Sequence, residues 1–169
     1  SLPTGDLEVG KVELGFPLPA LATEILTTTG HHLRERSPQR QPLTEGRFEK
    51  VSMAGRPGFD ASLLLSVGEP GFGFEHGEVY SVHVGWSGNS VLSAERQPYT
   101  TGLIGGGEVL LGGEATLARG ETYTTPWLYG SYGDGLNEVA ARFHDYVRSC
   151  HPDLAVKPRP VILNTWEAV

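Results

Sequence analysis

The chain has 169 residues, a length that fits one domain with a hydrophobic core of useful size. Its formal net charge of −7 argues against a surface that binds the phosphates of nucleic acid, and no apolar run approaches the length that crosses a membrane. The one cysteine, Cys150, excludes an internal disulfide framework and a cysteine-based zinc site. It also favours a reducing compartment, so we expect a cytoplasmic protein.

Glycine and proline, with 23 and 12 residues, are spread along the chain and separate short apolar runs that predict β-strands. Strand patterns in the first part of the chain cover residues 9–16, 22–29, 48–53 and 61–67. Residues 31–43 are polar and contain Pro38 and Pro42, which predicts a loop. Residues 68–77 predict a glycine-rich turn.

The clearest strand pattern covers residues 79–86. Its side chains alternate between two faces, with Tyr80, Val82, Val84 and Trp86 on one and Ser81, His83 and Gly85 on the other. The turn at residues 87–89 predicts that residues 91–97 pair back onto this strand as a hairpin. We interpret Trp86 and Trp127, which both lie within strand patterns, as core residues.

The glycines at 105–107 lack the lysine and hydroxyl side chain of a phosphate-binding loop and do not open a helix. They therefore predict a flexible hairpin tip. Short strands over residues 109–111 and 115–117 flank a glycine turn. Residues 122–129 predict a last strand, interrupted by Pro126.

After residue 133 the apolar spacing becomes that of an amphipathic helix, which needs a partner surface. Asp134 can cap its start, and the helix runs to about Ser149. Its apolar residues share one stripe, made of Leu136, Val139, Ala140, Phe143 and Val147.

A proline-rich hinge at residues 157–160 leads into Val161, Ile162 and Leu163, which predict a strand buried on both faces. Such a strand needs neighbours for its backbone N–H and C=O groups. We therefore expect residues 161–169 to be the severed start of a second domain, and, because Ser1 is not a natural start, we also expect a cut N-terminus. The helix stripe and residues 161–163 would then form a sticky patch that favours self-association.

Many short strands followed by one helix favour an all-β fold, namely an antiparallel β-sandwich with one C-terminal linking helix. A closed β-barrel is the alternative, but it leaves the helix without a partner surface.

Several motifs, taken in order, extend this interpretation. They are Gly-His-His-Leu-Arg-Glu-Arg at 30–36, Phe-Glu-His-Gly-Glu-Val-Tyr at 74–80, Trp-Ser-Gly-Asn at 86–89, Gly-Glu-Thr-Tyr-Thr-Thr-Pro at 120–126, Phe-His at 143–144 and Pro-Val-Ile-Leu-Asn-Thr-Trp-Glu-Ala at 160–168. Together they resemble the bacterial α-galactosidases (melibiases) of glycoside hydrolase family 36. The likeness covers residues 30–169.

The resemblance implies a galactose-mutarotase-like supersandwich that precedes a catalytic (β/α)₈ barrel. Residues 1–132 would be the sandwich, 133–158 the linking helix and hinge, and 159–169 the start of the barrel. The parent enzyme would be a retaining glycosidase that removes terminal α-galactosyl residues from melibiose- and raffinose-type oligosaccharides. Its two catalytic aspartates would lie on later barrel strands, so we expect no catalytic residue in this chain and no activity of the chain alone.

The resemblance also assigns roles to individual residues. Trp166, at the end of the first barrel strand, would line the galactose site, where an indole stacks on the apolar face of a sugar; the alternative is a core tryptophan. His32 replaces the tryptophan that the family has before Arg-Glu-Arg, on a loop that reaches the sugar site of a neighbouring subunit. His32 would bind a sugar hydroxyl there, and the alternative is an exposed loop histidine.

Arg34, Glu35 and Arg36 are interpreted as an ion-pair cluster that anchors a subunit interface in a homo-oligomer, with a solvated charge run as the alternative. We expect no cofactor and no metal ion, because the adjacent side chains of His31 and His32 rarely converge on one ion.

Two other classes of function compete with this one. A carbohydrate-binding β-sandwich module would present a row of exposed aromatic rings on one sheet face, whereas Trp86 shares its predicted face with residues of the core. A pure interaction scaffold would not respond to sugars and would self-associate.

Overall fold

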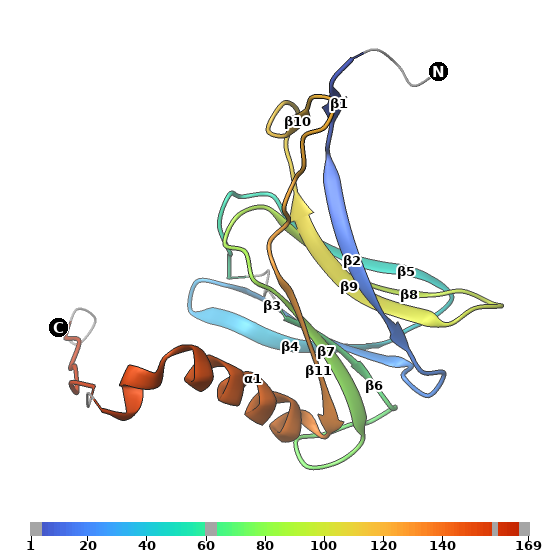
Figure 1. Cartoon of the computed structure of the whole chain (residues 1–169). Helices are drawn as coiled ribbons and strands as arrows, with labels where there is room; N and C mark the ends of the chain where they lie inside the picture. Colours follow the sequence, from blue (N-terminus) through green and yellow to red (C-terminus); the bar gives the residue numbers. More distant parts are fainter. Residues whose placement is uncertain (1–4, 60–63, 157–158, 166–169) are drawn as a thin grey trace.

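The computed structural model describes residues 5–59, 64–156 and 159–165. Within these residues the chain forms strands followed by two helices (Figure 1). The strands are β1 (Leu7–Glu8), β2 (Lys11–Leu18), β3 (Glu24–His31), β4 (Arg34–Pro42), β5 (Gly46–Ser52), β6 (Leu64–Gly68), β7 (Glu78–Val84), β8 (Ser90–Arg96), β9 (Gly102–Val109), β10 (Thr116–Leu117) and β11 (Leu128–Asp134). The helices are α1 (Leu136–Cys150) and the 3₁₀ helix η1 (Pro152–Ala155).

Two antiparallel sheets make up the body of the molecule. The five-stranded sheet has the order β11-β7-β6-β3-β4, and the four-stranded sheet has the order β2-β9-β8-β5. The short pair of β1 and β10 forms an arm that projects from this body (Figure 1). The predicted antiparallel sandwich is confirmed.

The hydrophobic core lies between the two sheets and receives alternate residues from each of them. Val82 and Val84 of β7 pack with Leu65 of β6 from one sheet, against Leu92 and Ile104 from the other. The predicted alternation of β7 is confirmed, because His83, between the two valines, points to the opposite face and contacts the rings of Tyr129 and Phe143.

Helix α1 covers the outer face of the five-stranded sheet at its β11–β7 end. Val139 is buried there with Phe72 and Val79, and Leu136 and Phe143 pack at the border of this second cluster. The helix therefore lies where its predicted stripe requires. Leu136 and Phe143 are partly buried against the sandwich, whereas Val147 is half exposed; the self-association expected of this stripe stays a prediction.

The start of α1 is capped by backbone groups rather than by the predicted Asp134 side chain. The N–H groups of Gly135, Leu136 and Asn137 donate to the carbonyl oxygens of Gly77, Gly73 and Phe74, respectively, over 2.9–3.0 Å. Asp134 is instead the last residue of β11, and its N–H donates to Glu138 Oε2 at 2.7 Å. The loop before β7 thus closes directly onto the helix and satisfies its first donors.

The predicted hairpin between residues 79–86 and 91–97 does not form. β7 pairs with β6 and β11, whereas β8 pairs with β5 and β9 in the other sheet. The turn at residues 87–89 therefore carries the chain from one sheet to the other, which is how a sandwich connects strands that follow each other closely in the sequence.

The predicted hairpin tip at residues 105–107 is also wrong. Gly105 and Gly106 are buried within β9, which pairs with β2 and β8. A side chain at Gly105 would clash with the backbone oxygen of Leu14, and one at Gly107 with that of Val12. The glycines are needed because the backbones of β2 and β9 approach closely, not because the segment turns.

Two further strand predictions require correction. The polar segment 31–43 was predicted to be a loop but contains β4, an exposed strand at the edge of its sheet that pairs with β3. Pro38 and Pro42, which lack a backbone N–H, are tolerated there because the outer side of an edge strand has no neighbouring strand to accept hydrogen bonds. Residues 122–127 lie outside any strand, and the last strand is β11, which starts later and pairs with β7 over seven positions from Leu128 to Asp134.

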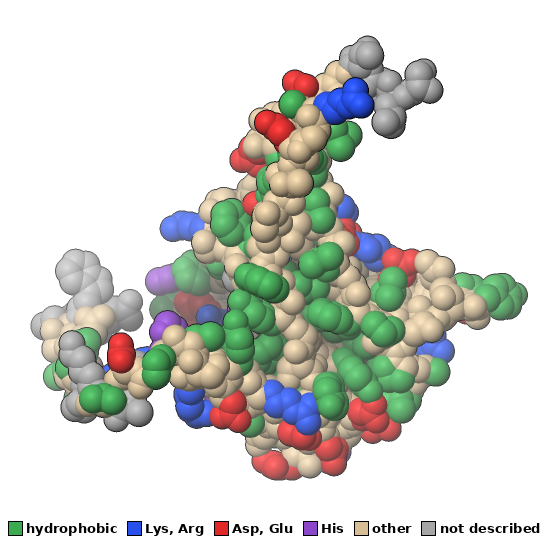
Figure 2. Space-filling view, in the orientation of Figure 1, with side chains coloured by type: hydrophobic (Ala, Val, Ile, Leu, Met, Phe, Trp, Pro, Cys, Tyr) green, Lys and Arg blue, Asp and Glu red, His purple; other side chains and the backbone are tan. Residues whose placement is uncertain are grey.

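Several large apolar side chains are exposed against expectation. Trp86 is 40% and Trp127 is 76% exposed, so neither is the core residue that the sequence predicts. Figure 2 shows further hydrophobic side chains across the middle of this view, over the region of β2 and β11. Residues 161–163 form no strand, and Val161, Ile162 and Leu163 are 101%, 81% and 85% exposed.

Among the described helices, none has the length and apolar character that a membrane crossing requires.

Candidate functional site

The turn between β3 and β4 holds His32, Arg34, Glu35 and Arg36. β3 ends at His31 and β4 begins at Arg34, and the pairing register shifts between Thr29 and His31. A Cβ atom on Gly30 would lie 2.7 Å from the oxygen of Phe59 and 2.8 Å from the nitrogen of Arg36. Gly30 therefore allows this turn to fold tightly against the segment that follows β5.

His32 is exposed and rests edge-on against a second aromatic ring. The centroids of the His32 and Phe59 rings are 6.0 Å apart, and the ring planes are inclined by 63°. Phe59 is itself half exposed, and its carbonyl oxygen accepts a hydrogen bond from the Arg36 N–H at 3.5 Å. No sequence pattern pointed to Phe59, because it lies on a loop far along the chain from His32.

Glu35 holds the turn in its unusual backbone conformation. Leu33 has a φ of 70° and Arg36 a φ of 54°, in the left-handed region that side chains rarely adopt. The Leu33 N–H donates to Glu35 Oε1 at 2.9 Å. Hydrogen bonds from the backbone N–H groups of Glu35 and Leu33 lower the pKa of this carboxyl, and the nearby His32 and His31 rings act in the same direction.

The predicted ion-pair cluster does not form within the described part of the chain. Among the ion pairs there, none joins Glu35 to Arg34 or Arg36, and both arginines are exposed. The Glu35 carboxylate accepts hydrogen bonds from the backbone instead, and the side chains of Arg34 and Arg36 lie on the surface of the same turn as His32. The turn therefore presents positive charge and donors to whatever approaches it.

This arrangement suits binding rather than reaction. A histidine ring, a phenyl ring and two guanidinium groups can stack on an apolar face and donate to hydroxyl or carboxylate oxygens. Within residues 30–36 Glu35 is the one carboxylate, so the turn lacks the pair of carboxylates that glycoside hydrolysis requires. Among the described residues, no three His, Cys, Asp or Glu side chains gather closely enough to hold a metal ion.

The other predicted sugar contact, Trp166, lies outside the described residues, as does Glu167. Cys150 is an exposed free thiol at the end of α1.

A buried carboxylate elsewhere in the sandwich has a structural role that the sequence did not reveal. Glu108 of β9 is buried and accepts a hydrogen bond from the Tyr123 hydroxyl. This bond, with help from burial, raises the pKa of Tyr123 to about 12. The pair fastens the segment between β10 and β11 onto the sandwich, and it lies on a different strand from the β3–β4 turn.

A different polar cluster lies at the other end of β4. Arg40 pairs with Glu24, donates to the Phe72 carbonyl oxygen at 2.7 Å and lies 4.4 Å from the centroid of the Phe72 ring. It borders a shallow hollow of about 670 Å³ between β3, β4 and the loop that holds Pro70. In these contacts the Arg40 guanidinium binds groups of its own chain. The cluster therefore has a structural role, which is to hold the loop that contains Phe72 against β4.

Comparison with known proteins places this geometry in a family. Residues 2–118 match the family model of the glycosyl hydrolase family 36 N-terminal domain, and residues 122–169 match the melibiase model. An α-galactosidase from Escherichia coli is 34% identical over an alignment of 173 residues, which covers 100% of this chain and 24% of that protein.

Solved structures agree with these matches. The galactosidase domain of the α-galactosidase–sucrose kinase AgaSK, a protein known from Mediterraneibacter gnavus, superposes with a TM-score of 0.81 at 26% identity, over 98% of this chain and 24% of that chain. A variant of the α-galactosidase AgaA from Geobacillus stearothermophilus, in complex with raffinose, superposes with a TM-score of 0.69 at 25% identity, over 81% of this chain and 19% of that chain.

The chain thus spans about a quarter of the length of the E. coli relative and less of others. Since the first model alone matches well over half of its residues and the E. coli protein aligns along all of it, the chain belongs to glycosyl hydrolase family 36, of which it carries the N-terminal domain.

Proposed function

We propose that this chain is the non-catalytic N-terminal scaffold of a retaining α-galactosidase. The observation that carries the proposal is the pair of adjacent family matches, in which the N-terminal domain of family 36 is followed at once by the beginning of melibiase. The parent enzyme removes terminal α-galactosyl residues from melibiose- and raffinose-type oligosaccharides. The raffinose bound to the AgaA variant supports this class of substrate.

The proposal divides the chain into a sandwich at residues 1–132, a linking helix and hinge at 133–158 and the start of a (β/α)₈ barrel at 159–169. Hydrolysis with retention needs a carboxylate nucleophile and a carboxyl acid–base about 5–5.5 Å apart. In this proposal both groups lie in the polypeptide that follows residue 169. The sandwich supports the barrel that carries them, and no cofactor takes part.

The β3–β4 turn acts between subunits in this proposal. His32 donates to a sugar hydroxyl in the site of a neighbouring subunit, and Arg34, Glu35 and Arg36 anchor the contact in a cytoplasmic homo-oligomer. The exposed guanidinium groups and the contact between His32 and Phe59 support this role. Trp166 would supply a stacking surface for galactose in the barrel of its own subunit.

The test compares the 169-residue chain with the full-length protein that contains it, using an aryl α-galactoside as substrate. The full-length protein is expected to release the aryl group and the 169-residue chain is not. Turnover by the chain alone, or the lack of turnover by the full-length protein, would contradict the proposal. An aryl β-galactoside serves as the matched control, because a retaining α-galactosidase leaves it intact.

A second candidate function is a carbohydrate-binding module, which the exposure of Trp86 and Trp127 favours. Aromatic rings on a surface can stack on sugars without any catalysis. Titration of the 169-residue chain with raffinose, followed by tryptophan fluorescence, separates the two candidates. A saturable change at millimolar or lower concentration supports the module, and no change supports the scaffold.

A further inference from the structure

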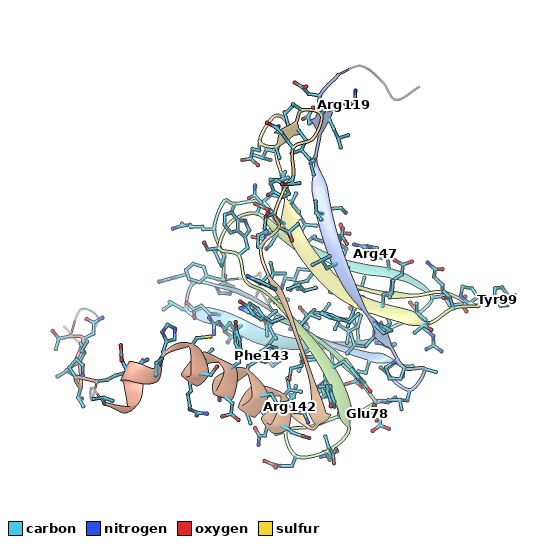
Figure 3. All side chains as sticks on the ribbon, in the orientation of Figure 1. Arg47, Glu78, Tyr99, Arg119, Arg142 and Phe143 are labelled. Carbon is cyan, nitrogen blue, oxygen red and sulfur yellow. The ribbon has the colours of Figure 1, made fainter. Side chains whose placement is uncertain are left out.

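The outer side of the five-stranded sheet carries a group of aromatic and apolar side chains that we name the outer aromatic face. It consists of Trp127, Tyr129, Phe143, Tyr146 and Val147. Trp127 directly precedes β11 and Tyr129 belongs to it, and the other three come from the C-terminal half of α1. Figure 3 shows Phe143 between α1 and the sheet.

Ring contacts join Tyr129, Tyr146 and Phe143. The rings of Tyr129 and Tyr146 have centroids 5.2 Å apart. His83 of β7 links Tyr129 to Phe143, with centroid distances of 6.4 Å to both rings. The carbonyl oxygen of Trp127 accepts a hydrogen bond from the Gly85 N–H at 2.8 Å, which holds the Trp127 backbone beside the end of β7, two residues before Tyr129.

The face is fixed in shape but open to solvent. Trp127 is largely exposed, and Tyr146 and Val147 are about half exposed. The Tyr146 hydroxyl is hydrogen-bonded to Tyr129, and this bond, followed by a weaker contribution from Cys150, raises the pKa of Tyr146. A contiguous apolar surface of rigid rings is typical of a protein contact and not of a surface that stays in water.

The family matches indicate what covers this face. Its five residues all lie within residues 122–169, which match the melibiase model, and not within residues 2–118, which match the N-terminal domain. About three quarters of the E. coli relative has no counterpart in this chain. Helix α1 also leads from the sandwich toward the exposed residues 161–163 (Figure 1).

We propose that the outer aromatic face is the surface on which the remaining three quarters of the family 36 polypeptide packs within the same molecule. This inference rests on the proposed function, because it takes the chain to be part of a longer family 36 enzyme. It fits better than a sugar platform, since the rings of Tyr129 and Tyr146 are inclined by 46° and present no flat surface to a pyranose.

The test is hydroxyl-radical footprinting, read by mass spectrometry, of the 169-residue chain and of the full-length protein. We expect Trp127 and Tyr146 to be oxidised readily in the 169-residue chain and at least about tenfold more slowly in the full-length protein. Tyr99 is the internal control, because it is 100% exposed at the tip of the β8–β9 connection, on the far side of the molecule from the end of α1 (Figure 3). Its oxidation rate should be the same in both.

Three outcomes would overturn the inference. Equal oxidation of Trp127 in both proteins would show that nothing covers the face. Protection that disappears on dilution would assign the face to a second copy of the chain. Protection that appears only after raffinose is added would assign it to a carbohydrate.

A substitution provides a second, independent measurement. Trp127→Asp should shift the melting temperature of the 169-residue chain by less than about 2 °C, because the side chain is already in water, and lower that of the full-length protein by about 5 °C or more. The control Tyr99→Asp should change neither. Equal small shifts for Trp127→Asp in both proteins would also contradict the inference.

The aryl α-galactoside assay of the same full-length sample separates this inference from the proposed function. An active protein with an unprotected face would contradict the inference alone. An inactive protein with a protected face would contradict the proposed function alone.

Discussion

The sandwich core and the segment after α1 contain the same kinds of apolar side chain in opposite surroundings. Leu65, Val82 and Val84 are buried between the two sheets of the sandwich, whereas Val161, Ile162 and Leu163 are exposed. Both runs have the composition of a buried strand. The difference shows that apolar composition indicates which segments can form a buried strand. Whether such a segment is buried depends on the presence of neighbouring strands.

The outer aromatic face lies between these two extremes. Its inner members, such as Phe143, pack against the sandwich, and its outer members, such as Trp127, do not. Burial of apolar side chains therefore decreases from the sandwich core to the outer aromatic face and from there to residues 161–163.

Leu65→Ala tests the closed core. Leu65 is 0% exposed, so its truncation removes buried apolar surface and leaves a cavity. We expect a loss of about 2–5 kcal/mol in the free energy of unfolding, measured by urea denaturation of the 169-residue chain. Leu163→Ala is the matched control and should change that energy by less than about 0.5 kcal/mol. Similar losses in the free energy of unfolding for the two variants would contradict the difference in burial between Leu65 and Leu163.

Gly107→Ala tests the close approach of β2 and β9. The added Cβ would clash with the backbone oxygen of Val12, which a change of rotamer cannot relieve. We expect a loss of about 3 kcal/mol in the free energy of unfolding, at the upper end for overpacking. Gly10→Ala is the control, because nothing lies within 4 Å of its Cβ position. A neutral Gly107→Ala variant would favour the hairpin tip that the sequence first predicted.

Tyr123→Phe tests the buried contact of Glu108. The variant removes the hydroxyl that donates to this carboxylate, so we expect a loss of about 1–2 kcal/mol in the free energy of unfolding. Tyr99→Phe, at an exposed tip, is the control.

The same pair predicts a pH dependence. The pKa of Tyr123 is raised from its usual 10 to about 12 in the folded chain. The stability it contributes is therefore complete below pH 10 and is lost as the pH rises toward 12, because the unfolded chain then releases the proton more easily. The decline over this range should be smaller in Tyr123→Phe, and an unchanged decline would contradict the assignment.

Glu13→Gln should have the smallest effect. Partial burial tends to raise the pKa of Glu13, but hydrogen bonds from Lys11 and Arg47 outweigh it, so the pKa is lowered. The ion pairs of Glu13 therefore stabilise the fold at neutral pH and are lost as the pH falls through this lowered value. Because they lie on the outer surface of the four-stranded sheet, we expect a loss of about 0.2–1 kcal/mol that becomes smaller in 1 M salt. A loss that salt does not reduce would contradict a surface electrostatic origin.

Parts of the fold that depend on local periodicity could be predicted from the sequence. The alternation of Val82, His83 and Val84 gave β7 and its buried face, and the spacing of Leu136, Val139 and Phe143 gave α1 and its contact surface. These patterns follow from the two repeat lengths of regular backbone structure.

Pairing between distant segments could not be predicted in this way. The short turn at residues 87–89 has the sequence of a hairpin, yet it crosses between sheets, because β7 finds its neighbours in β6 and in the much later β11. The glycines of β9 have the composition of a turn and are required by the nearby backbone of β2. The arginines and prolines of β4 suit an edge strand as well as a loop.

The candidate site was predicted in the same uneven way. The sequence placed His32 and its charged neighbours on one turn, because Gly30 and the residues after it form a local motif. It missed the contact with Phe59 and the use of Glu35 by backbone donors, since both depend on how the turn folds onto itself and on the segment after β5.

Hydrogen exchange of the backbone amides of residues 161–163 tests the central claim most directly. In the 169-residue chain these amides should exchange as fast as those of an unfolded peptide, whereas the amides of Val82 and Val84 should be strongly protected. In the full-length protein we expect residues 161–163 to become protected as well, by at least about a hundredfold, because adjacent strands of the remaining polypeptide pair with them. Fast exchange of these three amides in the full-length protein would contradict the account.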